Sequence, residues 1–334
     1  MKNTGTGMRV AAESAGLRAR PAALWIRALG LAMAVAGLCL ALGIAGSPVA
    51  QAGAPDYSHV GAFLDIDMGT RAMGMGGAFV ALADDPTALY YNPAGLAQIS
   101  SKSLLSGFAR LPAGINYGYA VVSLESLGVG GALLQAGDTR RDEYGEVIGN
   151  VLYADYAGFA GKGWQVGPLN LGVTGKVLVQ NLPDYRDQGF AADVGALWVL
   201  DPVRLGVEVR NLLGGMRYGS FERTISLGAG SQLLGGDLSL AGQLDIPVSD
   251  AQAQAAKDNT SVIRSVFKVG TLRAGAEYRF GVVALRAGLY RRGAEPVGFT
   301  GGIGAQIDRF QVDYGYQSDP RLADTHRLSL AIQF

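Results

Sequence analysis

The chain has 334 residues, of which 50 are glycine and only 17% are charged, and its mean hydropathy is +0.20. A soluble protein usually carries about 25% charged residues, so the composition favours a protein with a large apolar surface. The formal net charge of zero gives no argument for nucleic-acid binding, and two histidines with one cysteine exclude a site built from several such metal ligands.

The first 52 residues predict a cleaved secretory signal. Basic residues precede an apolar run at residues 28–44, and the small-x-small sequence AQA follows at residues 50–52, so we expect cleavage after Ala52. A transmembrane anchor is the alternative, but three glycines interrupt the run. Cleavage removes five of the 28 basic and one of the 28 acidic residues, which leaves 23 and 27. It also removes Cys39, so the mature chain has no thiol for a disulfide, for catalysis or for a metal.

Residues 53–100 differ from the rest of the chain and predict a partly helical plug. Asp85 caps free N–H groups and Pro86 tolerates the first helical position, so together they predict a helix start. Pro93 ends this helix within two turns, and Gly95 suits a tight turn. The candidate residues of this motif are Asp84, Asp85, Asn92, Pro93, Ala94 and Gly95.

Residues 101–334 alternate between apolar and polar side chains, which is the period of a β-strand. In residues 203–209 the odd positions are Val, Leu, Val and Val, whereas Arg204, Gly206 and Glu208 lie between them. A soluble β-sandwich also alternates, but here the polar face carries charges or glycine on nearly every strand. The predicted strands are residues 103–110, 115–125, 128–137, 153–163, 169–181, 189–200, 203–212, 223–234, 237–247, 268–280, 282–292, 297–307, 310–317 and 325–334.

The connections between these strands alternate in length. Short turns such as "SL", "DP" and "DR" alternate with long segments that begin at Gly137, Leu213 and Pro247. Outer-membrane barrels have this arrangement, and in lipid a sheet must close because an open edge leaves polar groups without water. We therefore expect an all-β protein, a transmembrane antiparallel β-barrel of about 14 strands, with residues 53–100 as a plug inside its lumen and residues 101–334 as the wall.

Charged residues recur on the face of the strands that is predicted to line the lumen. We expect opposite charges to pair there and to anchor the plug, and the alternative is a surface that selects a permeating solute. The candidates are Lys176, Asp193, Arg204, Glu208, Arg210, Arg273, Glu277, Arg279, Arg286 and Asp313.

The last strand, "RLSLAIQF", ends on an aromatic residue, Phe334. This ending resembles the C-terminal signal that the outer-membrane assembly machinery recognises, so that machinery and the outer-membrane lipids are predicted partners. Aromatic residues near the short turns, Trp164, Trp198, Phe280 and Phe310, are consistent with an interfacial girdle, with ordinary packing as the alternative for each.

Residues 69–100, "GTRAMGMGGAFVALADDPTALYYNPAGLAQIS", resemble the N-terminal signature of the FadL-like outer-membrane barrels, especially the PorV/PorQ branch. The resemblance implies a hatch that plugs a fourteen-stranded barrel, with the Asn-Pro-Ala motif at Asn92, Pro93 and Ala94. It also implies transport of hydrophobic molecules, or a role in type IX protein secretion like that of PorV. The chain is shorter than typical FadL transporters, so ligand contacts are not carried over.

The sequence gives little support for a nucleotide-binding or catalytic site. The glycines at 74, 76 and 77 do not fit a nucleotide-binding loop because Phe79 occupies its last glycine position. His326 and Ser329 are three apart on a strand and so point to opposite faces. We expect no enzyme activity, no cofactor and no metal. Three functions remain: passive passage of a hydrophobic molecule through a hatch-gated lumen in the outer membrane, a secretion scaffold that holds cargo or secretion-system proteins, and a general polar porin.

Overall fold

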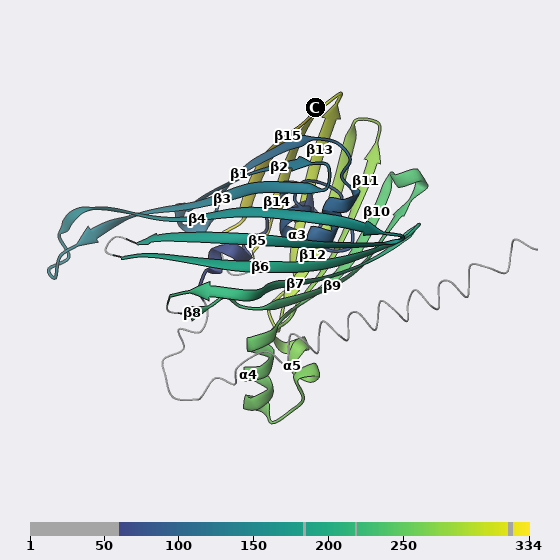
Figure 1. Cartoon of the computed structure of the whole chain (residues 1–334). Coiled ribbons are helices and arrows are strands. Elements are labelled where there is room, and N and C mark those ends of the chain that lie inside the picture. Colours follow the sequence, from purple (N-terminus) through teal and green to yellow (C-terminus); the bar gives the residue numbers. More distant parts are fainter. Residues whose placement is uncertain (1–59, 183–184, 218, 320–322) are drawn as a thin grey trace, which may run out of the picture.

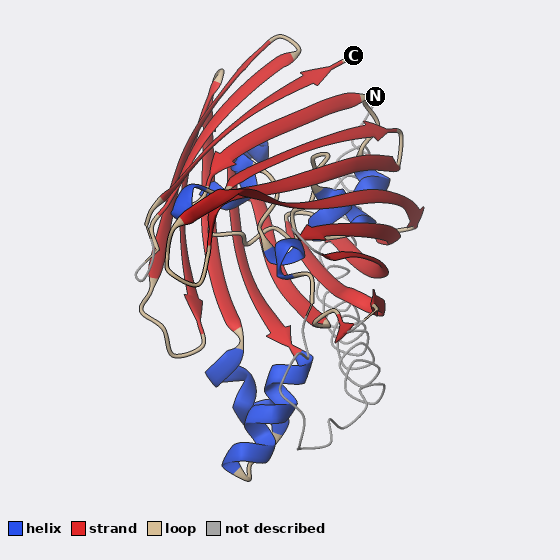
Figure 2. Cartoon of the chain, turned by 90° about the vertical axis from the view of Figure 1, so that its left-hand side faces the viewer, coloured by secondary structure: helices blue, strands red, loops and turns tan. Residues whose placement is uncertain are grey.

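The protein is a closed antiparallel β-barrel (Figures 1 and 2), as the sequence predicted. The computed structural model describes residues 60–334 apart from 183, 184, 218 and 320–322, so the predicted signal at 1–52 and residues 53–59 lie outside the described residues. Strand β1 pairs with both β2 and β15, and the pairings β6–β7 and β7–β9 complete the ring. Fourteen strands form the wall.

The strands of the wall agree with the predicted ranges, except that β3, β4, β6 and β7 run further at the end of the barrel where the long loops lie. A short strand, β8 (Gly219–Ser220), pairs with β7 outside the ring. The wall strands are β1 (Ser103–Arg110), β2 (Asn116–Leu124), β3 (Leu127–Arg141), β4 (Val147–Val166), β5 (Leu169–Leu182), β6 (Tyr185–Leu200), β7 (Val203–Met216), β9 (Thr224–Leu233), β10 (Leu238–Pro247), β11 (Thr271–Phe280), β12 (Val283–Arg292), β13 (Gly298–Ile307), β14 (Phe310–Gln317) and β15 (Thr325–Gln333).

Helices are few and short. No helix in the described part of the chain has the length and apolarity that a bilayer crossing requires. Those that precede the barrel are η1 (Ala62–Asp65), α2 (Thr70–Gly74), α3 (Ala88–Tyr91) and η2 (Pro93–Gln98). Those in the connections are η3 (Pro112–Gly114), η4 (Leu234–Gly236), α4 (Val248–Asp258) and α5 (Val262–Val269).

Two segments that the sequence predicted as loops have regular structure. Residues 137–151 extend the β3–β4 hairpin, whose turn is closed by Asp142: its carboxylate accepts hydrogen bonds from the N–H groups of Tyr144 and Glu146, both at 2.9 Å. The connection that begins at Pro247 forms α4 and α5, and β11 accordingly starts at Thr271 rather than at 268. Both segments are long enough to form their own local hydrogen bonds.

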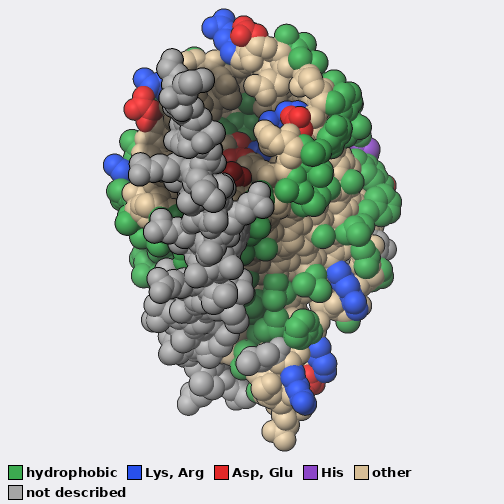
Figure 3. Space-filling model, turned by 90° about the vertical axis from the view of Figure 1, so that its right-hand side faces the viewer, with side chains coloured by type: hydrophobic (Ala, Val, Ile, Leu, Met, Phe, Trp, Pro, Cys, Tyr) green, Lys and Arg blue, Asp and Glu red, His purple; other side chains and the backbone are tan. Residues whose placement is uncertain are grey.

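The wall separates charge from apolar surface. On β12, Ala284, Arg286 and Tyr290 are buried toward the lumen, whereas Leu285 and Leu289 point outward with 47% and 54% of their surface exposed. Hydrophobic side chains cover much of the visible outer surface, and charged side chains lie in the hollow of the barrel (Figure 3). This distribution suits a wall with lipid outside and a polar lumen inside.

The β6–β7 pairing is interrupted by a bulge that the sequence did not predict. Val194 faces Val209 and Ala192 faces Leu213, so three residues of β7 oppose Asp193 alone. Asn211, at the centre of the bulge, has a φ of +52°, and its N–H donates to Asp193 Oδ1 at 2.7 Å. Lys176 lies 2.7 Å from the same carboxylate oxygen, so the bulge is held by a buried charge pair.

Candidate functional site

The segment from Val60 to Ser100, which we call the hatch, fills the lumen. Its helices lie inside the ring of strands (Figure 2). Helix α2 contacts β12–β15 on one side of the lumen, and η2 contacts β3–β6 on the other. Aromatic and apolar side chains of the hatch pack against Tyr117, Tyr119 and Phe159 of the wall in one core. The hatch therefore spans the lumen from wall to wall.

Asn92 makes hydrogen bonds both within the hatch and to strand β6 of the wall. Its side chain is fully buried, and its Nδ2 donates to the carbonyl of Val80 at 2.9 Å and to that of Ala196 in the wall at 3.1 Å. Its Oδ1 accepts from the N–H of Ala94 at 3.1 Å and so caps η2. An amide that donates twice and accepts once fits this position, because a buried polar group needs its hydrogen-bond partners.

Glycines on the lumen-facing side of the wall allow the backbone of the hatch to approach the strands closely. A Cβ at Gly195 would lie 2.0 Å from Asn92 Oδ1, and one at Gly172 would lie 2.1 Å from the carbonyl carbon of Pro93. The same close approach, at 2.2–2.3 Å to backbone atoms of the hatch, recurs at Gly163, Gly206, Gly275 and Gly288. Part of the high glycine content therefore serves the contact between wall and hatch.

Asp85 lies in the turn before helix α3, which begins at Ala88 with Thr87 as its N-cap residue, two residues later than the sequence predicted. Its Oδ1 accepts hydrogen bonds from the N–H of Thr87 at 2.9 Å and from the Thr87 hydroxyl at 2.5 Å. The helix ends at Tyr91, immediately before Asn92 and Pro93. Gly95 is packed so closely that a Cβ there would lie 1.9 Å from the carbonyl oxygen of Ala83.

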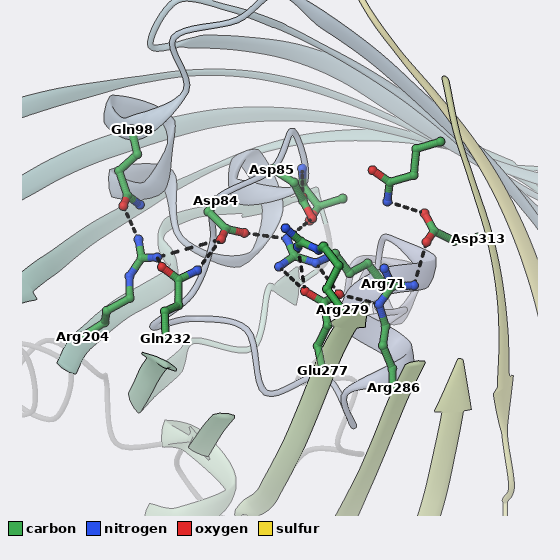
Figure 4. A network of polar contacts seen from close by, with 12 residues as sticks. Arg71, Asp84, Asp85, Gln98, Arg204, Gln232, Glu277, Arg279, Arg286 and Asp313 are labelled. Atoms are coloured by element: carbon green, nitrogen blue, oxygen red, sulfur yellow. Dashed lines mark hydrogen bonds and ion pairs between the residues drawn. The ribbon is translucent and has the colours of Figure 1, made fainter. Parts of the chain in front are cut away.

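Arg71 of α2 lies at the centre of an ion-pair network between hatch and wall (Figure 4). Its Nε and Nη2 donate to the two carboxylate oxygens of Glu277 on β11, each at 2.9 Å. Its Nη1 donates to Asp84 at 2.5 Å and to Asp85 at 3.2 Å. One arginine thus joins the predicted motif to the wall.

The wall side of this network extends over β11, β12 and β14. Glu277, 1% exposed, also accepts from Arg286 Nε at 2.6 Å and from Arg279 Nη2 at 3.1 Å. Arg286 Nη1 donates to Asp313 at 2.6 Å. A carboxylate shared by three arginines and an arginine shared by two carboxylates form a connected set, which is the arrangement in which buried charges are compensated.

A second branch of the network reaches β7 and β9. The amide of Gln232 donates to Asp84 at 3.0 Å and accepts from Arg204 Nη1 at 2.9 Å. Arg204 Nη2 donates to the Oε1 of Gln98 at the end of η2. The hatch is therefore held by polar contacts on both sides of the lumen.

Nearer the long-loop end, Arg273 of β11 joins the first part of the hatch to β10. Its Nη1 donates to Asp67 Oδ2 at 2.9 Å and to the carbonyl of Gly76 at 3.1 Å, and its Nε donates to Asp245 at 2.6 Å. Arg327 of β15 donates to the carbonyl of Asp67.

Glu208 and Arg210 lie beside the bulge rather than in the Arg71 network. Glu208 is 2% exposed, with Oε2 3.7 Å from Arg210 Nε, and Arg210 lies over the ring of Tyr90, 5.8 Å from its centroid. The ten predicted charges thus point into the lumen but divide into separate groups.

Sequence reasoning missed Arg71, Asp67 and Asp245. Arg71 and Glu277 are 206 residues apart, so only the closed barrel brings them together. A signal for Arg71 was present, because it is a single charge within the small apolar stretch "GTRAMGMGGAFVALA". Such a charge becomes buried when the segment does, and a buried charge requires a partner.

A cavity of about 600 Å³ opens at the long-loop end of the barrel. Ala62 and residues 65–67 of the hatch line it, and the ends of β7, β10, β11 and β15 contribute to its walls. Charged side chains such as Asp65, Arg210 and Arg327 alternate in the lining with Ile66 and Leu111. No group of three or more His, Cys, Asp or Glu residues in the described ranges is placed to hold a metal ion.

The chain is similar to known proteins in its fold. No family model and no curated protein matches the chain. The CymD monoaromatic hydrocarbon channel matches it with a TM-score of 0.53 and 13% identity over 80% of this chain and 97% of that one. The chain shares the barrel fold of this channel. The toluene transporters TodX of P. putida and TbuX of Ralstonia pickettii match with TM-scores of 0.54 and 0.51, at 11% and 13% identity, each over 80% of this chain and 98% of that one.

Proposed function

We propose that this protein is an outer-membrane channel for the passive passage of hydrophobic small molecules through a hatch-gated lumen. The observation that carries the proposal is the hatch that fills the barrel beneath an open cavity, in a fold shared with a monoaromatic hydrocarbon channel and two toluene transporters. The long-loop end faces the outside of the cell, and the short turns face the periplasm, as in other outer-membrane barrels. The predicted signal peptide at residues 1–52, the assembly machinery that reads Phe334 and the outer-membrane lipids belong to this proposal.

In this mechanism a molecule enters the cavity at the long-loop end and the hatch rearranges near Asn92 to let it pass. The apolar side chains of Ile66, Leu111, Pro112 and Pro247 offer it contacts in the cavity. Below them the hatch is held by hydrogen bonds and ion pairs rather than by covalent links, so it can shift when these contacts exchange. Passage follows the concentration gradient, and the mechanism uses no cofactor.

Uptake of radiolabelled toluene by cells tests the proposal. Cells that carry the protein are expected to take up toluene faster than cells without it, and the double change Asn92→Ala, Pro93→Ala is expected to alter that rate several-fold while the barrel still assembles. Tyr144→Ala is the matched control, because Tyr144 is 84% exposed at the tip of the β3–β4 hairpin. Equal uptake with and without the protein would contradict the transport function.

A secretion scaffold is the second candidate, and one observation favours it. The cavity lining is not a continuous apolar groove, since charges interrupt it, and the hatch backbone lies against wall glycines that leave it no free space. A scaffold of the PorV type would use such a sealed barrel to hold cargo or secretion-system proteins. Mass spectrometry of the purified barrel separates the candidates: a bound hydrophobic molecule supports transport, whereas a stoichiometric protein partner supports the scaffold. A general polar porin is disfavoured by the filled lumen.

A further inference from the structure

The connection between β10 and β11 is a pair of helices that projects from the long-loop end of the barrel (Figures 1 and 2). Helices α4 and α5 pack against each other, and Lys268 of α5 binds Asp258 of α4 at 2.7 Å. The amide of Gln254 donates to the same carboxylate at 2.8 Å. The pair is therefore a defined element rather than an irregular loop.

The base of this helix pair is packed against the lipid-facing side of the wall. Val209, Ile225 and Ile246 point outward, because their neighbours Glu208, Ser226 and Asp245 face the lumen, yet all three are buried. The residues that cover them are Val248, Ala251 and Val266 of α4 and α5. The helices thus sit at the edge of the membrane-facing surface and not over the mouth of the lumen alone.

The outer face of α5 combines an exposed aromatic side chain with cations. Phe267 is 68% exposed, and Arg264 and Lys268 beside it are exposed as well. Lys257 on α4 is also exposed, and neither Lys257 nor Arg264 has an acidic partner within 4 Å among the described residues. Aromatic and basic side chains are the residue types with which interfacial helices contact acyl chains and anionic headgroups.

The exposed side chain of Phe267 continues an apolar surface that the wall already presents. On β6, β7 and β11, the side chains of Phe190, Leu213 and Leu272 point outward and are 62%, 56% and 47% exposed. Exposed apolar side chains on the outer face of a membrane barrel are covered by lipid. Phe267 precedes Leu272 by five residues, and α5 extends the same surface beyond the first residue of β11, Thr271.

We propose that α5 lies in the outer leaflet of the membrane, with Phe267 among the acyl chains and Arg264 and Lys257 at the phosphates of anionic lipids. The helix pair then fixes the height of the β10–β11 edge of the barrel in the membrane. Burial of the Phe267 ring removes apolar surface from water, and each basic side chain near an anionic surface adds electrostatic attraction. The occupant of this face is therefore the lipid surface itself.

Spin-label accessibility tests the proposal on the full barrel reconstituted in vesicles of anionic phospholipid. Phe267→Cys, in a Cys39→Ala background, carries the label, with Leu272→Cys as the lipid-facing reference and Tyr144→Cys as the water-facing reference. Position 267 is expected to be several-fold less accessible to a water-soluble nickel chelate than position 144 and to be accessible to oxygen, like position 272. Nickel access equal to that at 144 would overturn the proposal, as would protection from both reagents, which indicates a protein contact.

The role of the cations is tested separately. In vesicles of zwitterionic lipid the label at 267 is expected to lie less deeply than in anionic vesicles, and the double change Lys257→Gln, Arg264→Gln is expected to abolish that difference. Heat-modifiable migration on gels shows for every variant that the barrel has folded. A depth that does not depend on lipid charge in the parent protein would contradict the assignment of Lys257 and Arg264 to lipid phosphates.

Discussion

Asn92 shows how a single side chain can define the relation between hatch and wall. It makes its three hydrogen bonds to two parts of the hatch and to β6, and it is fully buried. The side chain fits only because the facing wall residue is Gly195. The hydrogen bonds of the Asn-Pro-Ala turn therefore depend on Gly195, which lies 103 positions after Asn92 in the chain.

Gly195→Ala is expected to displace the hatch without opening the barrel. The new Cβ would lie 2.0 Å from Asn92 Oδ1, and overpacking of this kind costs about 1–3 kcal/mol. We expect faster hydrogen exchange in residues 84–100 and unchanged heat-modifiable migration. Gly137→Ala is the control, because a Cβ at Gly137 meets no atom within 4 Å. Equal exchange in both variants would show that the close approach has no bearing on the hatch.

Glu277→Gln is expected to weaken the hold of the wall on the hatch. The change removes the carboxylate that Arg71, Arg279 and Arg286 share, and removal of one partner from a buried charge network costs about 3–5 kcal/mol. Urea titration of the barrel in detergent measures the loss of unfolding free energy, and limited proteolysis reports release of the hatch. Glu146→Gln at the exposed tip of the β3–β4 hairpin should change neither. A stable variant with a protected hatch would show that the hatch is held by packing alone.

At the scale of elements, the strands were predictable and the helix pair was not. Alternation fixes which residues of a strand face lipid, so the ranges and the fold class follow from the sequence. Val266 and Ala251 instead become buried against Val209 and Ile225, which lie elsewhere in the chain, and local pattern does not reveal such contacts. The same limit applies to Arg71 and Glu277 in the candidate site, since the barrel brings them together. The hatch motif could be located from Asp85, Asn92 and Pro93, but its anchors on the wall could not.

Acid is expected to loosen the helix pair. The hydrogen bond from Lys268, followed by that from Gln254, lowers the pKa of the Asp258 carboxyl below its usual value. A carboxyl with a depressed pKa in the folded protein stabilises the fold above its unfolded pKa of about 3.9, and this contribution is lost as pH falls through the folded pKa. A spin label at Ala256→Cys in the Cys39→Ala background should therefore become more mobile below about pH 4. With Asp258→Asn added, the label should be mobile at all pH values, and a pH response that persists there would assign it to another group.

At the scale of the whole molecule, the filled lumen sets this protein apart from an open pore. Apolar contacts, wall glycines and two polar groups around Arg71 and Arg273 all act between the hatch and the wall. The barrel thus has a continuous interior instead of a water-filled channel. A molecule that crosses must exchange some of these contacts for its own, so the rate of passage should depend on the hatch more than on the diameter of the wall.

The path of the hatch also bears on the order in which the molecule is built. The N–H of Val60 donates a hydrogen bond to the carbonyl of Ser220 at the long-loop end, and the hatch reaches the opposite end at Ser100, just before β1. Its chain therefore runs the length of the lumen before the first strand starts. Since the ring is completed by the pairing of β1 with β15, we expect the hatch to be laid against the inner surface while that seam is still open. Pairing of β15 with β1 then closes the barrel around a hatch that already occupies the lumen.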